Sequence, residues 1–204
     1  MCSSDLTITV NDLTGTDVNQ VAIDLGAQPG SAGGDGKADT IVINATNGDD
    51  AIAVTNNDGV VTVSGLAEVV TISNFEANDR IVINGLGGDD VITASGLTGM
   101  LFTANGGDGD DVLVGTPGND VLTGGPGDDV LIGGGGQDVL DGGPGNNVVM
   151  TSATTSDGSL APPPALLGQF MASSFVTAGS GDSGTPIEDA PPSQQQPLLA
   201  QPHA

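Results

Sequence analysis

The sequence predicts an all-β solenoid over residues 7–150, in which short strands alternate with glycine-rich turns, followed by a disordered tail. Three observations lead to this fold class. A nine-residue unit repeats from Gly106 to Met150, aliphatic segments recur upstream at a spacing near ten residues, and residues 151–204 become rich in Ser, Thr, Pro and Gln. The chain has no Trp or Tyr and only 4 Phe, so its core has to be built from Val, Ile, Leu and Ala.

The repeated unit is a nonapeptide that divides into a six-residue turn and a three-residue strand. Five copies follow one another without a gap: GGDGDDVLV, GTPGNDVLT, GGPGDDVLI, GGGGQDVLD and GGPGNNVVM. Glycines at positions 1, 2 and 4 allow positive φ and a tight bend. Alternation along the strand directs position 8 inward, so we expect an interior ladder of Leu113, Leu122, Leu131, Leu140 and Val149. The outward valine at position 7 is either a docking stripe or simply a residue of high β-propensity.

Upstream, residues 7–104 are interpreted as degenerate turns of the same solenoid. The segment GLGGDDVIT at 85–93 is the nearest match to the nonapeptide, and LTITV and VAIDL are the expected first strands. Further β-rich segments begin near Ile41, Ala51, Val60, Val69, Ile81, Val91 and Leu101.

Charge sets the next constraint. The chain has 26 acidic residues against Lys37 and Arg80, a formal net charge of −24, which repels nucleic acid and anionic membranes and attracts cations. No apolar run is long enough for a membrane span, and no Sec-type signal peptide is recognised. Cys2 is the only cysteine, so no disulfide framework is expected. Residues 1–6 read like a translated sequencing-library adapter, so we expect them to be non-native and the chain to be a fragment of a longer protein.

The turns offer oxygen ligands only. A tight glycine turn aims carbonyl oxygens inward, and the aspartate at position 6 adds a carboxylate. Ca²⁺ takes about 6–8 oxygen ligands, whereas the absence of His and Cys from residues 105–150 disfavours zinc, copper and iron. The candidate calcium-binding residues are Gly106, Asp108, Asp111, Gly115, Asp120, Gly124, Asp129, Gly133, Asp138 and Asp90. Among the upstream acids, Asp39, Asp50 and Asp90 are either further ligands or solvated turn residues, because their turns lack a full set of glycines.

Residues 106–150 resemble the RTX, or haemolysin-type calcium-binding, nonapeptide repeat family. The resemblance is carried by the pattern GGxGxDxUx, from which only Thr116 and Asn147 depart. It implies a parallel β-roll in which two nonapeptides form one coil. It also implies export by a type I secretion apparatus into extracellular, calcium-rich surroundings.

The same resemblance implies that calcium binds between repeats two apart. Asp111 would then face Asp129, and Asp120 would face Asp138. Asp129 would face Asn147, which is neutral, so that site is expected to be weaker.

No residue pattern points to an enzyme. His203 is the only histidine and lies in the Pro/Gln-rich tail, so a Ser–His–Asp arrangement among residues 7–150 is excluded. Three hypotheses remain: a calcium-dependent folding and export module, a structural or adhesive surface solenoid, and the C-terminal fragment of a secreted enzyme or toxin. In the tail, apolar residues at Ala165–Val176 suggest a short helix that either serves export, caps the solenoid or has no role.

Overall fold

The computed structural model describes residues 5–28 and 33–151. All of them belong to the first of two compact units, Met1–Pro164. The tail at 152–204, including the segment expected at Ala165–Val176, lies outside the described residues, as do residues 1–4. Within the described part every regular element is a β-strand, and no helix is present there that could cross a membrane.

The described residues form fourteen strands. Their bounds are β1 Thr7–Val10, β2 Gln20–Asp24, β3 Thr40–Asn44, β4 Ala51–Asn57, β5 Val60–Ser64, β6 Val69–Ser73, β7 Arg80–Gly87, β8 Val91–Gly96, β9 Leu101–Asp108, β10 Val112–Val114, β11 Asp120–Thr123, β12 Val130–Ile132, β13 Val139–Asp141 and β14 Val148–Met150. Each predicted strand starts at, or one residue from, its expected position, so the predicted strand positions are confirmed.

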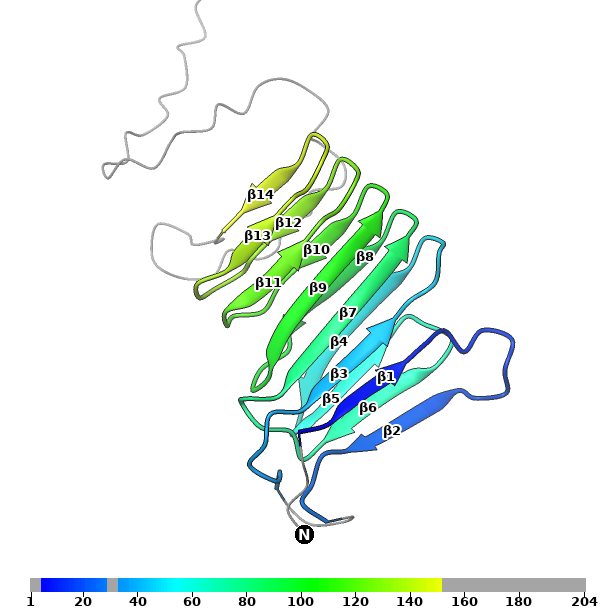
Figure 1. The fold of residues 1–204 in the computed structure, drawn as a ribbon, viewed down its shortest axis with the longest axis vertical. Coiled ribbons are helices and arrows are strands. Elements are labelled where there is room, and N and C mark those ends of the chain that lie inside the picture. The colour runs from blue at the N-terminus through cyan, green and yellow to red at the C-terminus, as the bar shows by residue number, and fades with distance from the viewer. Residues whose placement is uncertain (1–4, 29–32, 152–204) are drawn as a thin grey trace, which may run out of the picture. The chain divides into compact units, whose positions relative to one another are not determined.

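The strands form two sheets between which the chain passes back and forth (Figure 1). The first, called sheet A here, has the order β1-β3-β7-β9-β11-β13. The second, sheet B, has the order β14-β12-β10-β8-β4-β5-β6-β2. Apart from β4–β5–β6, all neighbouring strands run parallel. The parallel β-roll expected from the sequence is therefore confirmed.

One coil of the roll takes 18 residues where the nonapeptides repeat, since Val112 pairs with Val130 and Val121 with Val139. The coil from Val91 to its partner Val112 contains 21 residues, and the preceding coil, from Ala51 to its partner Val91, contains 40. The upstream coils therefore keep the parallel register of the repeats while varying in length.

The 40-residue coil contains an antiparallel meander, β4–β5–β6. The interpretation of every upstream segment as a solenoid turn is wrong for β5 and β6, which widen sheet B instead. Asn57 pairs with Val60 across a two-residue loop in which both residues have positive φ, 51° at Asp58 and 80° at Gly59. Positive φ at both positions is the requirement of a type I′ hairpin turn, so the chain reverses here instead of crossing to sheet A.

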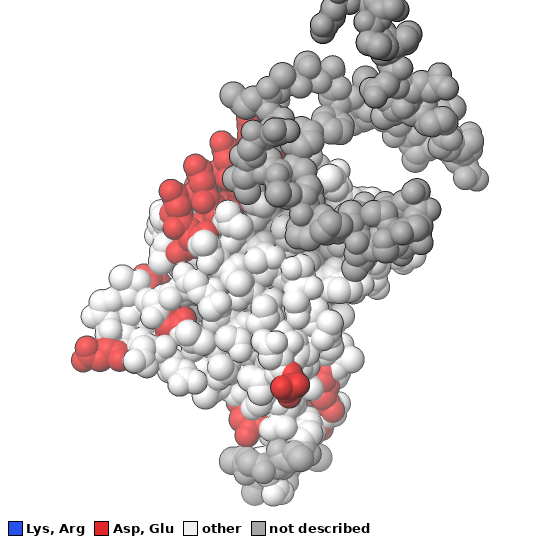
Figure 2. Space-filling view, turned by 180° about the vertical axis from the view of Figure 1, so that it is seen from behind, with Lys and Arg blue, Asp and Glu red and all other residues white. Residues whose placement is uncertain are grey.

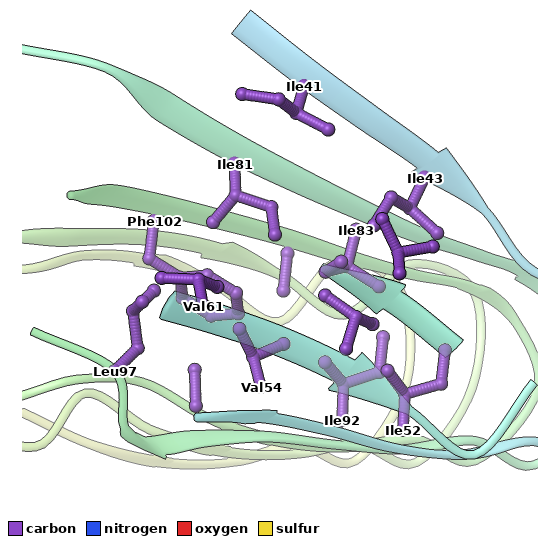
Figure 3. Close-up of a cluster of buried hydrophobic side chains, with 14 of the residues drawn as sticks. Ile41, Ile43, Ile52, Val54, Val61, Ile81, Ile83, Ile92, Leu97 and Phe102 are labelled. Carbon is purple, nitrogen blue, oxygen red and sulfur yellow. The ribbon is translucent and has the colours of Figure 1, made fainter. Parts of the chain in front are cut away.

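The core of the roll lies between the two sheets and is widest in the N-terminal coils. There each strand directs two large side chains inward, such as Ile41 and Ile43 from β3 and Ile81 and Ile83 from β7 (Figure 3). All four are fully buried. These coils therefore have a substantial apolar core of their own.

The core narrows in the C-terminal coils because each three-residue strand directs only one residue inward. Leu113, Leu122 and Leu131 are fully buried, as the predicted ladder requires. Leu140 is half-buried and Val149 is 44% exposed, because β13 and β14 are the outermost strands of their sheets. The first three residues of the ladder are therefore fully buried, and the last two are partly exposed to solvent.

A row of asparagine amides crosses the outer face of sheet A. Asn44 donates to Asn11 (2.8 Å), Asn84 donates to Asn44 (2.7 Å) and Asn105 donates to Asn84 (2.6 Å). Each hydrogen bond joins neighbouring strands or their ends, so the row helps to fix the register of β3, β7 and β9.

Candidate metal centre in the turns of the roll

The turns of the roll lie along two edges that differ in charge. The acidic edge is defined here by the six-residue turns from sheet A to sheet B: residues 45–50, 85–90, 106–111, 124–129 and 142–147. The opposite edge includes turns 115–120 and 133–138. The fifth residue of the turn is acidic in four of the five turns on the acidic edge but is Asn119 or Gln137 on the opposite edge. Figure 2 shows acidic side chains stacked in a row along the acidic edge.

The sixth residue of each turn forms a buried ladder. On the acidic edge, the backbone N–H of Asp90 donates to Asp111 Oδ1 (2.9 Å), that of Asp111 donates to Asp129 Oδ1 (2.9 Å), and that of Asp129 donates to Asn147 Oδ1 (2.7 Å). The N–H of Asp50 donates to Asp90 Oδ1 (2.8 Å) and extends the ladder upstream.

The opposite edge shows the same link between coils, because the N–H of Asp120 donates to Asp138 Oδ1 (3.0 Å). The structure therefore brings together the three residue pairs that the resemblance to the repeat family implies.

The second carboxylate oxygen has no hydrogen-bond partner at four of these aspartates. Within the described part of the chain, Oδ2 of Asp90, Asp111, Asp129 and Asp138 is buried and unpaired. Asp90, Asp111 and Asp129 are 0% exposed as whole residues. Neither of the chain's two basic residues lies in these turns. A buried carboxylate oxygen without a donor requires either a cation or a proton.

Burial also changes how tightly these groups hold their protons. It raises the pKa of Asp90 and of Asp111 to about 6, in each case partly opposed by the backbone N–H of the preceding coil. Burial likewise raises the pKa of Asp120 and Asp129 above the ordinary value. In the absence of metal, the edge therefore stores unfavourable negative charge that a divalent cation can neutralise.

The glycine at the first position of each turn lies against the aspartate of the same turn. A Cβ at Gly106 would lie 2.0 Å from Asp111 Oδ2, and one at Gly124 would lie 2.2 Å from Asp129 Oδ2. On the opposite edge, a Cβ at Gly115 would lie 2.5 Å from Asp120 Oδ2 and one at Gly133 would lie 2.1 Å from Asp138 Oδ2. None of these four glycines has positive φ. The expectation that position 1 needs glycine for a left-handed backbone is therefore wrong; it needs glycine because a carboxylate occupies the space.

Positions 2 and 4 do follow the expected reason. Gly107 has φ 122° and Gly109 has φ 134°, in the region that L-residues rarely adopt. A Cβ at either position would also collide with a carbonyl oxygen of the preceding coil, Leu86 O at 2.2 Å and Gly88 O at 2.1 Å. Close stacking of the coils therefore depends on these glycines.

Asp108 differs from the other candidates. It ends β9, its side chain is exposed, and its carbonyl accepts the N–H of Gly88 (2.9 Å). The structure does not bring its carboxylate into the buried ladder.

A second, exposed ladder was not included among the candidate site residues. The N–H of Asp89 donates to Asp49 Oδ1 (3.0 Å), that of Asp110 to Asp89 Oδ1 (2.9 Å), and that of Asp128 to Asp110 Oδ1 (2.8 Å). The signal for it is present in the sequence, as an Asp-Asp dipeptide that occurs in four of the five turns on the acidic edge and in neither turn 115–120 nor turn 133–138.

The donors in these turns suit a hard cation. In the described part of the chain, no three His, Cys, Asp or Glu side chains gather in a metal-binding group. Calcium held by the turns would therefore need backbone carbonyl oxygens in addition to aspartate oxygens, which agrees with its preference for several oxygen ligands. The unpaired Oδ2 atoms and the absence of soft ligands both fit calcium.

Comparison with known families identifies the repeats. Residues 105–140 and 114–149 match the family of the RTX calcium-binding nonapeptide repeat (4 copies). No match was found among curated proteins or among solved structures.

Proposed function

Residues 105–149 are RTX calcium-binding nonapeptide repeats, and from this premise we propose that calcium binding drives folding of the C-terminal coils of the roll. The observation that carries the proposal is the set of buried, unpaired Oδ2 atoms on Asp111, Asp129 and Asp138. Calcium is the ion that such repeats bind, and it supplies the positive charge that the turns themselves lack.

The small core of these coils supports a role in folding. Each nonapeptide directs at most one aliphatic side chain into the core, such as Leu122 or Leu131, and the burial of that side chain has to offset the conformational entropy of nine ordered residues. Metal bound only by the folded state adds its binding free energy to the stability of that state. The N-terminal coils, which bury two large residues per strand, depend less on this contribution.

The proposal extends to the setting of the protein. Submicromolar calcium would leave such sites largely empty, whereas millimolar calcium outside the cell would fill them, so folding would follow export. We assign the chain to the extracellular space, with a type I secretion apparatus as its exporter, on the strength of the repeat family. A non-catalytic role suits the described turns, whose chemistry is metal binding; the activity of any longer parent protein is a separate question.

Circular dichroism of the full chain tests the proposal. Strand signal should be lower in chelator, where the N-terminal coils still contribute, and should rise when calcium is added in millimolar excess, while the same concentration of magnesium should have a smaller effect. Asp129→Asn should shift the calcium midpoint to higher concentration. Asp58→Asn is the matched control, because Asp58 lies in the exposed hairpin turn and loses the same charge. A spectrum that does not change on addition of calcium would refute the proposal.

A further inference from the structure

The turns differ in whether the protein donates hydrogen bonds to both oxygens of the buried aspartate. The residue at the second position of the turn distinguishes the two arrangements. Turn 115–120 has Thr116 at this position, one of the two departures from the repeat pattern. The backbone N–H of Thr116 donates to Asp120 Oδ2, and its hydroxyl lies 2.8 Å from Asp120 Oδ1. The hydroxyl also accepts the N–H of Gly118 (2.9 Å). Both oxygens of Asp120 therefore have donors from the protein.

Turn 45–50 repeats this arrangement on the acidic edge. The N–H and the hydroxyl of Thr46 both reach Asp50 Oδ2, at 2.9 and 2.8 Å, and the N–H of Gly48 donates to Thr46 Oγ1 (3.1 Å). Two turns on different edges thus form the same closed network around a threonine. We call them closed turns.

In turns 106–111 and 124–129, which have glycine at the second position, the backbone N–H groups of the second and fourth residues donate to the next coil and not to groups of their own turn. Gly107 has positive φ, and its N–H donates to Gly124 O in the next coil (2.9 Å). The N–H of Gly109 donates to Pro126 O, also in the next coil (3.0 Å). No donor is then directed at Asp111 Oδ2, which is left buried and unpaired. We call this arrangement an open turn.

Turn 85–90 is an open turn although its second residue is not glycine. Leu86 has φ 79°, a left-handed conformation that is unfavourable for leucine because its Cβ crowds the neighbouring carbonyl oxygen. A Cβ at Gly85 would lie 2.1 Å from Asp90 Oδ2, as at Gly106 in the next coil. Asp90 is 0% exposed and its Oδ2 is unpaired. Strain in the backbone and an unpaired buried oxygen thus occur together, upstream of residues 105–149.

We propose that the second residue of each turn decides whether its aspartate takes calcium, so that turn 85–90 is a further calcium-binding turn and turns 45–50 and 115–120 are closed by threonine in place of calcium. The inference rests on the proposed function, since it assigns the same ion to specific turns. An open turn leaves one carboxylate oxygen for a cation. A closed turn directs an N–H and an O–H to that carboxylate, so a cation there would have to displace hydrogen bonds already made.

A pair of isosteric variants on one edge tests the assignment. Asp90→Asn and Asp50→Asn remove the same charge from adjacent coils of the acidic edge, one in an open turn and one in a closed turn. Equilibrium dialysis of the full chain against calcium should show fewer bound ions for Asp90→Asn and an unchanged number for Asp50→Asn. Dichroism in saturating calcium checks that both variants are folded. An unchanged number for Asp90→Asn, or an equal loss for both variants, overturns the inference.

The role of threonine has its own test. Thr116→Gly should open the turn, leave Asp120 Oδ2 without a donor and increase the number of calcium ions bound. Thr116→Ser keeps the hydroxyl and should bind the same number as the unmodified chain. If Thr116→Gly binds no more calcium than Thr116→Ser, threonine does not close the turn in the way described. An unmodified chain that binds no calcium would instead refute the proposed function itself, so the two failures are distinguishable.

Discussion

The calcium-free roll should lose stability as the pH rises from 5 to 7, because two carboxyl groups on its acidic edge are buried without a counter-charge. Burial raises the pKa of Asp90 and Asp111 from 3.8 to about 6. The folded chain therefore holds protons that the unfolded chain has already released. Between these pKa values the folded state binds more protons, so the free energy of unfolding falls as the pH rises.

The size of the effect follows from the distance between pH and pKa. At pH 5, about one unit below the folded-state pKa, each carboxyl contributes roughly 1–2 kcal/mol relative to pH 7. The two together contribute up to about 3 kcal/mol, an upper limit because the neighbouring groups titrate as a coupled pair. A change of this size is a large fraction of the stability of an ordinary domain, about 5–15 kcal/mol.

Urea unfolding of the calcium-free chain, followed by dichroism at pH 5 and pH 7, measures this difference. The double variant Asp90→Asn with Asp111→Asn should be nearly insensitive to pH over this range. In saturating calcium the sign should reverse for the unmodified chain, because protons then compete with the metal for the same oxygens. If the double variant keeps the full pH dependence in the absence of calcium, the effect comes from the overall charge of −24 and the reasoning is refuted.

Three further outcomes follow from particular contacts. Gly124→Ala should weaken calcium binding by at least tenfold in calorimetry, because its Cβ would lie 2.2 Å from Asp129 Oδ2. Leu131→Ala should lower the free energy of unfolding in calcium by about 2–5 kcal/mol, whereas Val139→Ala, at a residue 62% exposed, should change it by about 0.5 kcal/mol or less. Asn84→Ala interrupts the asparagine row and should lower the same quantity by about 1–2 kcal/mol in urea unfolding; no change would mean that the row does not stabilise the roll.

The strands of this protein could be predicted from its sequence because alternation and spacing act over a few residues. The ladder at Leu113, Leu122 and Leu131 follows directly from one inward position per nonapeptide. The meander was missed although its signal is local: Asp58-Gly59 between two β-rich segments is the typical sequence of a two-residue hairpin turn. The regular spacing of the segments around it concealed the reversal of the chain.

The turn chemistry could be predicted only in part. The type of ion and the presence of an aspartate at position 6 can be read from the repeat. Whether each carboxylate oxygen accepts a hydrogen bond depends on the directions of backbone N–H groups in two different coils, and the sequence does not give these directions. Thr116 reads in the sequence as a defect in the pattern, whereas in the structure it donates to Asp120. Asp90 lies in a turn that lacks the expected glycine at Leu86, and the positive φ of that leucine together with the unpaired Asp90 Oδ2 shows that the turn is open.

The buried aspartate ladder makes the acidic edge a one-dimensional array of nearest neighbours. One of the hydrogen bonds that join each turn to the next runs from the N–H of Asp111 to Asp129 Oδ1, and the same link recurs from Asp90 to Asp111. The carboxylate of one turn accepts an N–H from the preceding turn. An ion that holds this carboxylate in place therefore also orders the preceding turn, which then loses less conformational entropy when it binds its own ion. Successive ions would then bind cooperatively, and the steepness of the calcium response would depend on how many open turns stand in an unbroken row.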